Sequence, residues 1–146
     1  MRDLFHLWLP VDVRWGDMDS YGHVNNAVYF TYCESARMAY FAAVDMDSAK
    51  AEASHGPALA QASCNFRQQV HHPAELEVGA RVTRIGGKSF NLDYVIVRRG
   101  TEDVVCDGTS VVVWVDYGVG SAIPLPGALR QSIRRFEGPN ADFAGS

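Results

Sequence analysis

The sequence predicts an α+β protein in which one long helix is wrapped by a five-stranded antiparallel sheet. Two observations predict this class. The stretch 27–44 holds many good helix formers and neither Gly nor Pro. Extended segments rich in Val, Thr and aromatic residues lie on both sides of it. The 146 residues, 47% of them apolar, are typical of one globular domain. We therefore expect a single domain over 1–137 and a loose tail over 138–146.

The first strand and the helix follow from local patterns. Residues 7–16 predict a strand, because alternate positions are apolar. Asn25 or Asn26 is suited to cap the helix over 27–44. Polar residues form only a narrow stripe on that helix, so we expect the sheet to cover it on most sides.

Four more strands are predicted after the helix, over 58–72, 76–86, 89–99 and 103–117. Glycines in the turns at 86–88 and 99–102 are typical of hairpins. Together these signals predict that the four strands follow one another in a meander. A short helix over 126–136, with Pro126 near its first turn, is expected to end the fold.

Composition argues against several classes of function. The net charge is −4 and no block of basic residues occurs, which disfavours nucleic-acid binding. No apolar run approaches the roughly 18 residues of a membrane span, and the first residues lack a signal-peptide core, so we expect a cytoplasmic protein. The chain has three cysteines and no Cys-x-x-Cys pair, so we expect no disulfide framework. We also expect no metal site, because no set of possible ligands has a convincing spacing. No cofactor motif is present.

The segment directly before the helix carries the densest set of reactive side chains. Asp17, Asp19 and His23 lie within seven residues there. The first turn of a helix has free N–H groups and a partial positive charge, which can polarise a carbonyl oxygen. A nearby carboxylate can attack that carbonyl or activate a water. This is the layout of an acyl hydrolase, although two aspartates before a helix also commonly serve as turn formers.

The segment RWGDMDSYGHVNNAVYF, followed by ESAR, resembles the signature of the 4-hydroxybenzoyl-CoA thioesterase-like branch of the hotdog-fold superfamily. The likeness continues more weakly through FRQQVHHPAELEVG and RIGGKSF. The resemblance implies a hotdog fold and hydrolysis of an acyl-CoA thioester to a free acid and coenzyme A, with no metal or other cofactor. It also implies a homodimer or homotetramer with sites between subunits.

The resemblance implies roles for particular residues. Asp19 would be the nucleophile or general base, and the backbone N–H near Asn26 would polarise the thioester carbonyl. His23 and Asn25 would orient water or Asp19, while Asp17 would hold the turn.

Further residues are expected to contact the substrate. Tyr21, Val24 and Tyr29 would line an apolar tunnel for the acyl group. Lys88 and Ser89, after two glycines, would meet the phosphates of coenzyme A.

Alternatives remain at this stage. Some family members place the catalytic carboxylate on the central helix, where this chain has Glu34, although Glu34 and Arg37 also have the spacing of a helix ion pair. Others have an imidazole where this chain has Asn26. The substrate could be an acyl carrier protein thioester. A non-catalytic acyl-CoA-binding protein is the third alternative, and the presence of Asp19 argues against it.

Overall fold

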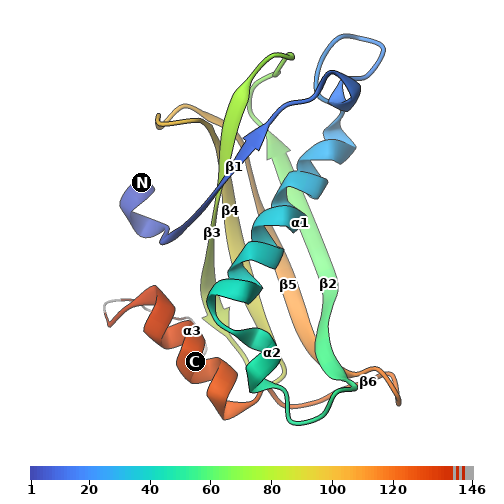
Figure 1. Ribbon diagram of the computed structural model, residues 1–146, viewed down its shortest axis with the longest axis vertical. Helices are drawn as coiled ribbons and strands as arrows, with labels where there is room; N and C mark the ends of the chain where they lie inside the picture. The colour runs from blue at the N-terminus through green and yellow to red at the C-terminus, as the bar shows by residue number, and fades with distance from the viewer. Residues whose placement is uncertain (140, 142, 144–146) are drawn as a thin grey trace.

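The computed structural model describes residues 1–139, 141 and 143, and one long helix lies along one face of its curled antiparallel sheet (Figure 1). In this described part, the strands are β1 (Leu7–Asp12), β2 (His55–Phe66), β3 (Glu75–Ile85), β4 (Ser89–Arg98), β5 (Val104–Asp116) and β6 (Ser121–Ala122). The five expected strands are confirmed, and β6 is a two-residue addition that pairs with β5.

The order of the strands differs from the expected four-strand meander. The sheet runs β1-β3-β4-β5-β2, so only β3, β4 and β5 form a meander, while β2 pairs with β5 and β1 takes the place beside β3. Alternation shows which residues form a strand but not which strand they pair with. Gly108 on β5 permits the observed pairing, because a Cβ there would lie 2.2 Å from the carbonyl oxygen of Ser63 on β2.

The long helix α1 (Asn26–Ala43) lies against one face of the sheet (Figure 1). It begins at Asn26 because the Asn25 side chain caps it by accepting a hydrogen bond from the Ala27 N–H at 3.0 Å. Its buried positions are three or four residues apart and form one stripe: Tyr29, Tyr32, Cys33, Ala36, Arg37, Tyr40 and Phe41. Phe30 and Met38 are exposed. The expectation that the sheet covers α1 on most sides is therefore wrong for the single chain, because the sheet reaches only one face.

The C-terminal helix α3 (Gly127–Glu137) confirms the expected helix within one residue, although Pro126 is its N-cap and precedes its first turn. Leu129 and Ile133 are fully buried. At its last residue, the Glu137 carboxylate accepts hydrogen bonds from the Tyr40 hydroxyl and the Val82 N–H, which ties α3 to α1 and β3.

Short elements depart most from the sequence pattern. Two single turns, η1 (Arg2–Leu4) and η2 (Trp15–Asp17), flank β1, which therefore ends at Asp12. The four-residue helix α2 (Met46–Ala49) was not expected, since it is too short to show a period. The tail expected over 138–146 includes residues 140, 142 and 144–146, which lie outside the described residues. No helix in the described part of the chain is both long and apolar enough to cross a membrane.

Candidate active site

A tight turn directly before α1 positions Asp19. The Asp19 N–H donates to the carbonyl of His23 at 2.8 Å, and the Gly22 N–H donates to the carbonyl of Asp19 at 3.1 Å. The turn requires φ of +84° at Gly22, a value that suits glycine. Asp19 Oδ1 accepts the Tyr21 N–H at 2.9 Å. Its Oδ2 has no hydrogen-bond partner among the described residues, so this oxygen is free to react.

The free carboxylate opens on a cavity of about 260 Å³ at the start of α1, which we name the helix-start pocket. Its lining residues are Asp19, His23, Val24, Asn26, Tyr29, Phe66, Arg67, Gln68 and Gln69. The structure thus brings together five of the residues that the sequence singled out. The other four come from the end of β2 and the connection that follows it.

Two polar groups at this pocket have no protein partner in the described part of the chain. The first N–H of α1 belongs to Asn26, and it donates to no acceptor among the described residues. The next N–H, of Ala27, donates to the side chain of the cap residue Asn25. A free N–H at a helix start can donate to a ligand oxygen. The buried Nδ1 of His23 is also unpaired. The Asn26 N–H can therefore donate to a bound molecule, whereas the His23 Nδ1 is enclosed by protein and has no partner among the described residues.

Asp17 occupies a different position from Asp19. It is buried, and its carboxylate accepts hydrogen bonds from the Arg14 N–H at 3.0 Å, the Arg14 guanidinium and the Tyr32 hydroxyl at 2.7 Å. Burial works against ionisation, but these hydrogen bonds outweigh it and hold the pKa of Asp17 below its ordinary value. Both oxygens of the Asp17 carboxylate thus accept hydrogen bonds from neighbouring residues. Asp17 therefore joins the turn to α1 and does not line the pocket.

Aromatic rings form the apolar wall of the helix-start pocket. The Phe66 ring lies 5.4 Å from that of Tyr29 and 6.4 Å from that of Phe30, between centroids. Burial raises the pKa of Tyr29 to about 12, so its phenol stays neutral. The wall can contact an acyl group without adding a charge.

Other expected site residues lie elsewhere in the single chain. Tyr21 is 84% exposed and does not line the pocket, and Asn25 serves as the helix cap. Ser89, next to Lys88, is the first residue of β4. The pocket residue Phe66 pairs with Cys106 on β5, and Cys106 pairs with Ile96 on β4, seven residues after Ser89. That offset places Lys88 and Ser89 roughly 23 Å along the strand from the pocket.

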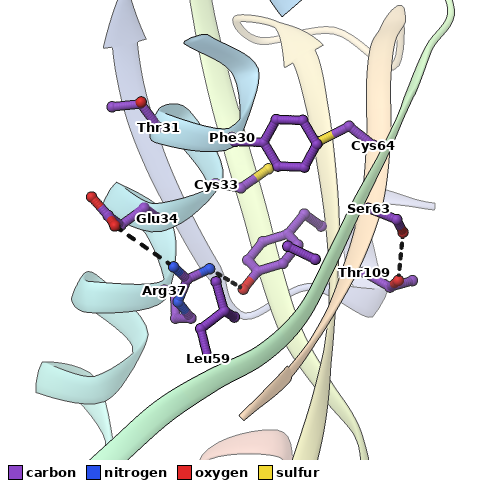
Figure 2. A pocket seen from close by; sticks show the side chains of 11 residues that line it. Phe30, Thr31, Cys33, Glu34, Arg37, Leu59, Ser63, Cys64 and Thr109 are labelled. Atoms are coloured by element: carbon purple, nitrogen blue, oxygen red, sulfur yellow. Dashed lines mark hydrogen bonds and ion pairs between the residues drawn. The ribbon is translucent and has the colours of Figure 1, made fainter. Parts of the chain in front are cut away.

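Glu34 lines a second cavity, of about 140 Å³, between α1 and β2, which we name the helix-side pocket (Figure 2). The Glu34 side chain is 64% exposed, and its carboxylate lies 3.9 Å from the Arg37 guanidinium. The expected pairing of these two residues is present but loose. Glu34 does not share a pocket with Asp19.

The sequence reasoning missed Phe66, Arg67, Gln68 and Gln69 as pocket residues. Because β2 ends at Phe66 and not at residue 72, the connection 67–74 is a loop that returns to the start of α1. The Val24 N–H donates to the carbonyl of Val70 at 2.8 Å and holds the loop there. The stretch FRQQV was part of the weaker resemblance, and that was the available signal.

Two histidines, His71 and His72, lie within this loop. His71 was expected within the strand over 58–72 but lies in the loop. Its Nδ1 is 2.6 Å from the carbonyl oxygen of Gly22. Its ring is 5.1 Å from that of His23. Among the described residues, no three His, Cys, Asp or Glu side chains are grouped to hold a metal ion.

Comparison with known proteins identifies the family of this chain. The family model described as the thioesterase-like superfamily matches residues 13–133. FadM of Escherichia coli, a long-chain acyl-CoA thioesterase, is 28% identical over 128 residues, which are 86% of this chain and 96% of FadM.

Solved structures share the same fold. The PA2801 protein of Pseudomonas aeruginosa is 34% identical, with a TM-score of 0.79 over 89% of this chain and 99% of that one. A thioesterase of Thermus thermophilus, solved with coenzyme A and zinc, is 29% identical, with a TM-score of 0.79 over 92% and 96% of the two chains. The chain therefore belongs to the thioesterase-like superfamily and is a thioester hydrolase.

Proposed function

We propose that this protein hydrolyses an acyl-CoA to a free acid and coenzyme A, in the manner of the 4-hydroxybenzoyl-CoA thioesterase-like branch. The observation that carries the proposal is that one pocket is lined both by Asp19, which has a free carboxylate oxygen, and by Asn26, which has a free N–H. FadM supports an acyl-CoA substrate, as does the coenzyme A bound to the Thermus thermophilus protein.

The carbonyl oxygen of the thioester would accept the Asn26 N–H at the positive end of α1. This contact strengthens as negative charge develops on the oxygen, so it lowers the barrier to attack. His23 also lines this pocket and would orient the water or Asp19. Tyr29 and Phe66 supply the apolar wall for the acyl carbons next to the thioester.

Asp19 can act in two ways. As a nucleophile, its carboxylate attacks the carbonyl carbon, the C–S bond breaks, and water then cleaves the resulting anhydride. As a general base, it takes a proton from a water that attacks the carbon directly. Both routes consume one water and release the acid and the thiol of coenzyme A.

The decisive experiment measures thiol release from acyl-CoA esters by wild type and Asp19→Asn. Asparagine keeps the shape and the hydrogen bond from the Tyr21 N–H but can neither attack nor accept a proton well. We expect kcat to fall by roughly 10²–10⁴ with KM little changed. The matched control is Asp17→Asn, two residues earlier, which should keep the kcat of the folded enzyme.

A full rate in Asp19→Asn would contradict the assignment and make Glu34 the next residue to replace. Loss of turnover in folded Asp17→Asn alone would show that the two aspartates have exchanged roles. Acyl-CoA and acyl carrier protein thioesters of the same acyl group, assayed side by side, decide which carrier is the substrate.

We also propose that the protein acts as a homodimer or homotetramer. Support comes from β2, which is an edge strand of the sheet and has a row of backbone groups unpaired by any other described strand. Apolar side chains are exposed on β2 and on the adjacent face of α1: Leu59, Phe66, Phe30 and Met38. Self-association would cover both. Sedimentation that gives a 16.1 kDa species at micromolar concentration would refute this proposal.

A further inference from the structure

Arg37 is a buried charge without a carboxylate in hydrogen-bonding distance. The residue is 7% exposed and lies on α1, where its guanidinium projects toward β2 (Figure 2). Its Nη1 donates to the Tyr94 hydroxyl at 3.1 Å, and Tyr94 in turn shares a 2.7 Å hydrogen bond with Ser110. Glu34, at 3.9 Å, is beyond hydrogen-bonding range and mostly in solvent. A guanidinium has five N–H donors, and within the described residues only one hydrogen bond uses them.

The other guanidinium nitrogens of Arg37 are not among the fully buried, unpaired polar atoms of the described residues, so water or a ligand can reach them at the helix-side pocket. A buried charge is normally paired, because removing it from water carries a large penalty. Here the guanidinium lines the helix-side pocket beside the apolar side chains of Phe30, Leu59 and Ala62. Burial raises the pKa of Tyr94, so that partner is a neutral hydroxyl. The helix-side pocket therefore has apolar and hydroxyl side chains along its wall and the Arg37 cation at one point, while the Glu34 carboxylate lies mostly in solvent at its edge.

The two pockets follow one another along the same helix. Asn26 and Tyr29 line the helix-start pocket, whereas Phe30 and Arg37 line the helix-side pocket. On the β2 side, Phe66 belongs to the first pocket and Cys64 to the second. Arg37 lies eleven residues after Asn26, which is about 16 Å along the helix axis. An acyl group that has its carbonyl at Asn26 and runs along this side of α1 would bring its far end to Arg37.

We propose that the helix-side pocket binds the far end of the acyl group and selects a chain that carries an oxygen there, a carboxylate or a hydroxyl. This inference rests on the proposed acyl-CoA thioesterase function. A guanidinium binds a carboxylate through two parallel hydrogen bonds and a hydroxyl through one, so the carboxylate is the stronger ligand. A plain hydrocarbon end would leave the unused N–H groups of Arg37 unpaired.

The test compares CoA thioesters of equal chain length that end in a methyl, a hydroxyl or a carboxyl group. Wild type should favour the carboxyl end over the methyl end by about tenfold or more in kcat/KM, with the hydroxyl end between them. Arg37→Met should bring the ratio close to one. Arg37→Lys keeps the charge without the planar fork and should give an intermediate ratio. Because each ratio is measured on one preparation, partial unfolding of a variant cancels.

Arg134→Met is the control, because Arg134 is exposed on α3 and lines neither pocket; it should leave the ratio unchanged. A wild-type ratio near one, or a ratio that Arg37→Met leaves intact, overturns the inference while thioesterase activity stands.

A second arm measures calorimetric binding of the free products, the plain acid and the acid with a second, terminal carboxyl group. Tighter binding of the second acid, lost in Arg37→Met, supports the inference even if no thioester is hydrolysed and the proposed function has failed. Equal binding of the two acids to wild type overturns it.

Discussion

Replacement of Asp17 with Asn removes a negative charge from a buried hydrogen-bond network and should lower the stability of the fold. The carboxylate is 3% exposed, and its Oδ2 accepts the Arg14 N–H at 3.0 Å and the Tyr32 hydroxyl at 2.7 Å. An asparagine can place its amide oxygen at this position and keep both bonds as neutral ones. Its amide nitrogen then faces the Arg14 guanidinium, whose side chain is 79% exposed and can move away.

The magnitude follows from the loss of charge in these two bonds. A hydrogen bond to a charged group contributes about 1.5–3 kcal/mol and a neutral one about 0.5–1.5 kcal/mol. Two such changes predict that Asp17→Asn lowers the free energy of unfolding by about 2 kcal/mol. Asp19→Asn should change it by less than about 0.5 kcal/mol, because the amide oxygen can still accept the exposed Tyr21 N–H.

The assay is urea unfolding of wild type and both variants at one protein concentration, since self-association would add to the apparent stability. Equal stability of Asp17→Asn and Asp19→Asn would refute the structural role of Asp17.

The pH dependence supplies an independent check. The folded-state pKa of Asp17 is lowered from 3.8, so its charge stabilises the fold above that pH. The contribution is lost as the pH falls through the lower folded-state value. The stability difference between wild type and Asp17→Asn should therefore be constant near neutral pH and shrink below pH 3.8. A difference that stays the same in acid would contradict the reasoning.

Two further predictions concern coenzyme A and the sheet. If Lys88 contacts a phosphate, Lys88→Ala should raise KM in steady-state kinetics and leave kcat unchanged, and added salt should reduce the effect. If Arg67→Ala raises KM and Lys88→Ala does not, the phosphate contact lies at the helix-start pocket instead. Gly108→Ala should destabilise the fold by more than about 2 kcal/mol in urea unfolding, because its Cβ would meet the carbonyl of Ser63 at 2.2 Å. Gly87→Ala, which meets no atom within 4 Å, is the control and should change little.

The reach of sequence reasoning can be followed in the elements themselves. Good helix formers and the Asn25 cap act within a turn or two, and the predicted helix over 27–44 differs by one residue at each end from α1. Alternation over 89–99 likewise identified β4 within one residue. Asp19, His23 and Asn26 were found because they are close in sequence, and a tight turn before a helix keeps neighbours together in space.

Contacts between distant segments were not predictable in the same way. The local pattern of β2 does not indicate that its partner is β5. That pairing is permitted by Gly108, more than forty residues later in the chain. The same pairing turns the loop after Phe66 back to α1 and adds Arg67, Gln68 and Gln69 to the helix-start pocket. It also separates Lys88 from that pocket.

By itself, then, the sequence determined the helix, the strands and the group of reactive residues before α1, because short-range backbone preferences and side-chain periodicity specify them. The tertiary structure alone decided the strand order, the second half of the helix-start pocket and the burial of Arg37. These depend on which surfaces meet when the whole chain packs. In the sequence, Glu34 and Arg37 have the spacing of an exposed helix ion pair. The positions of β2 and Tyr94 bury Arg37 and leave Glu34 in solvent.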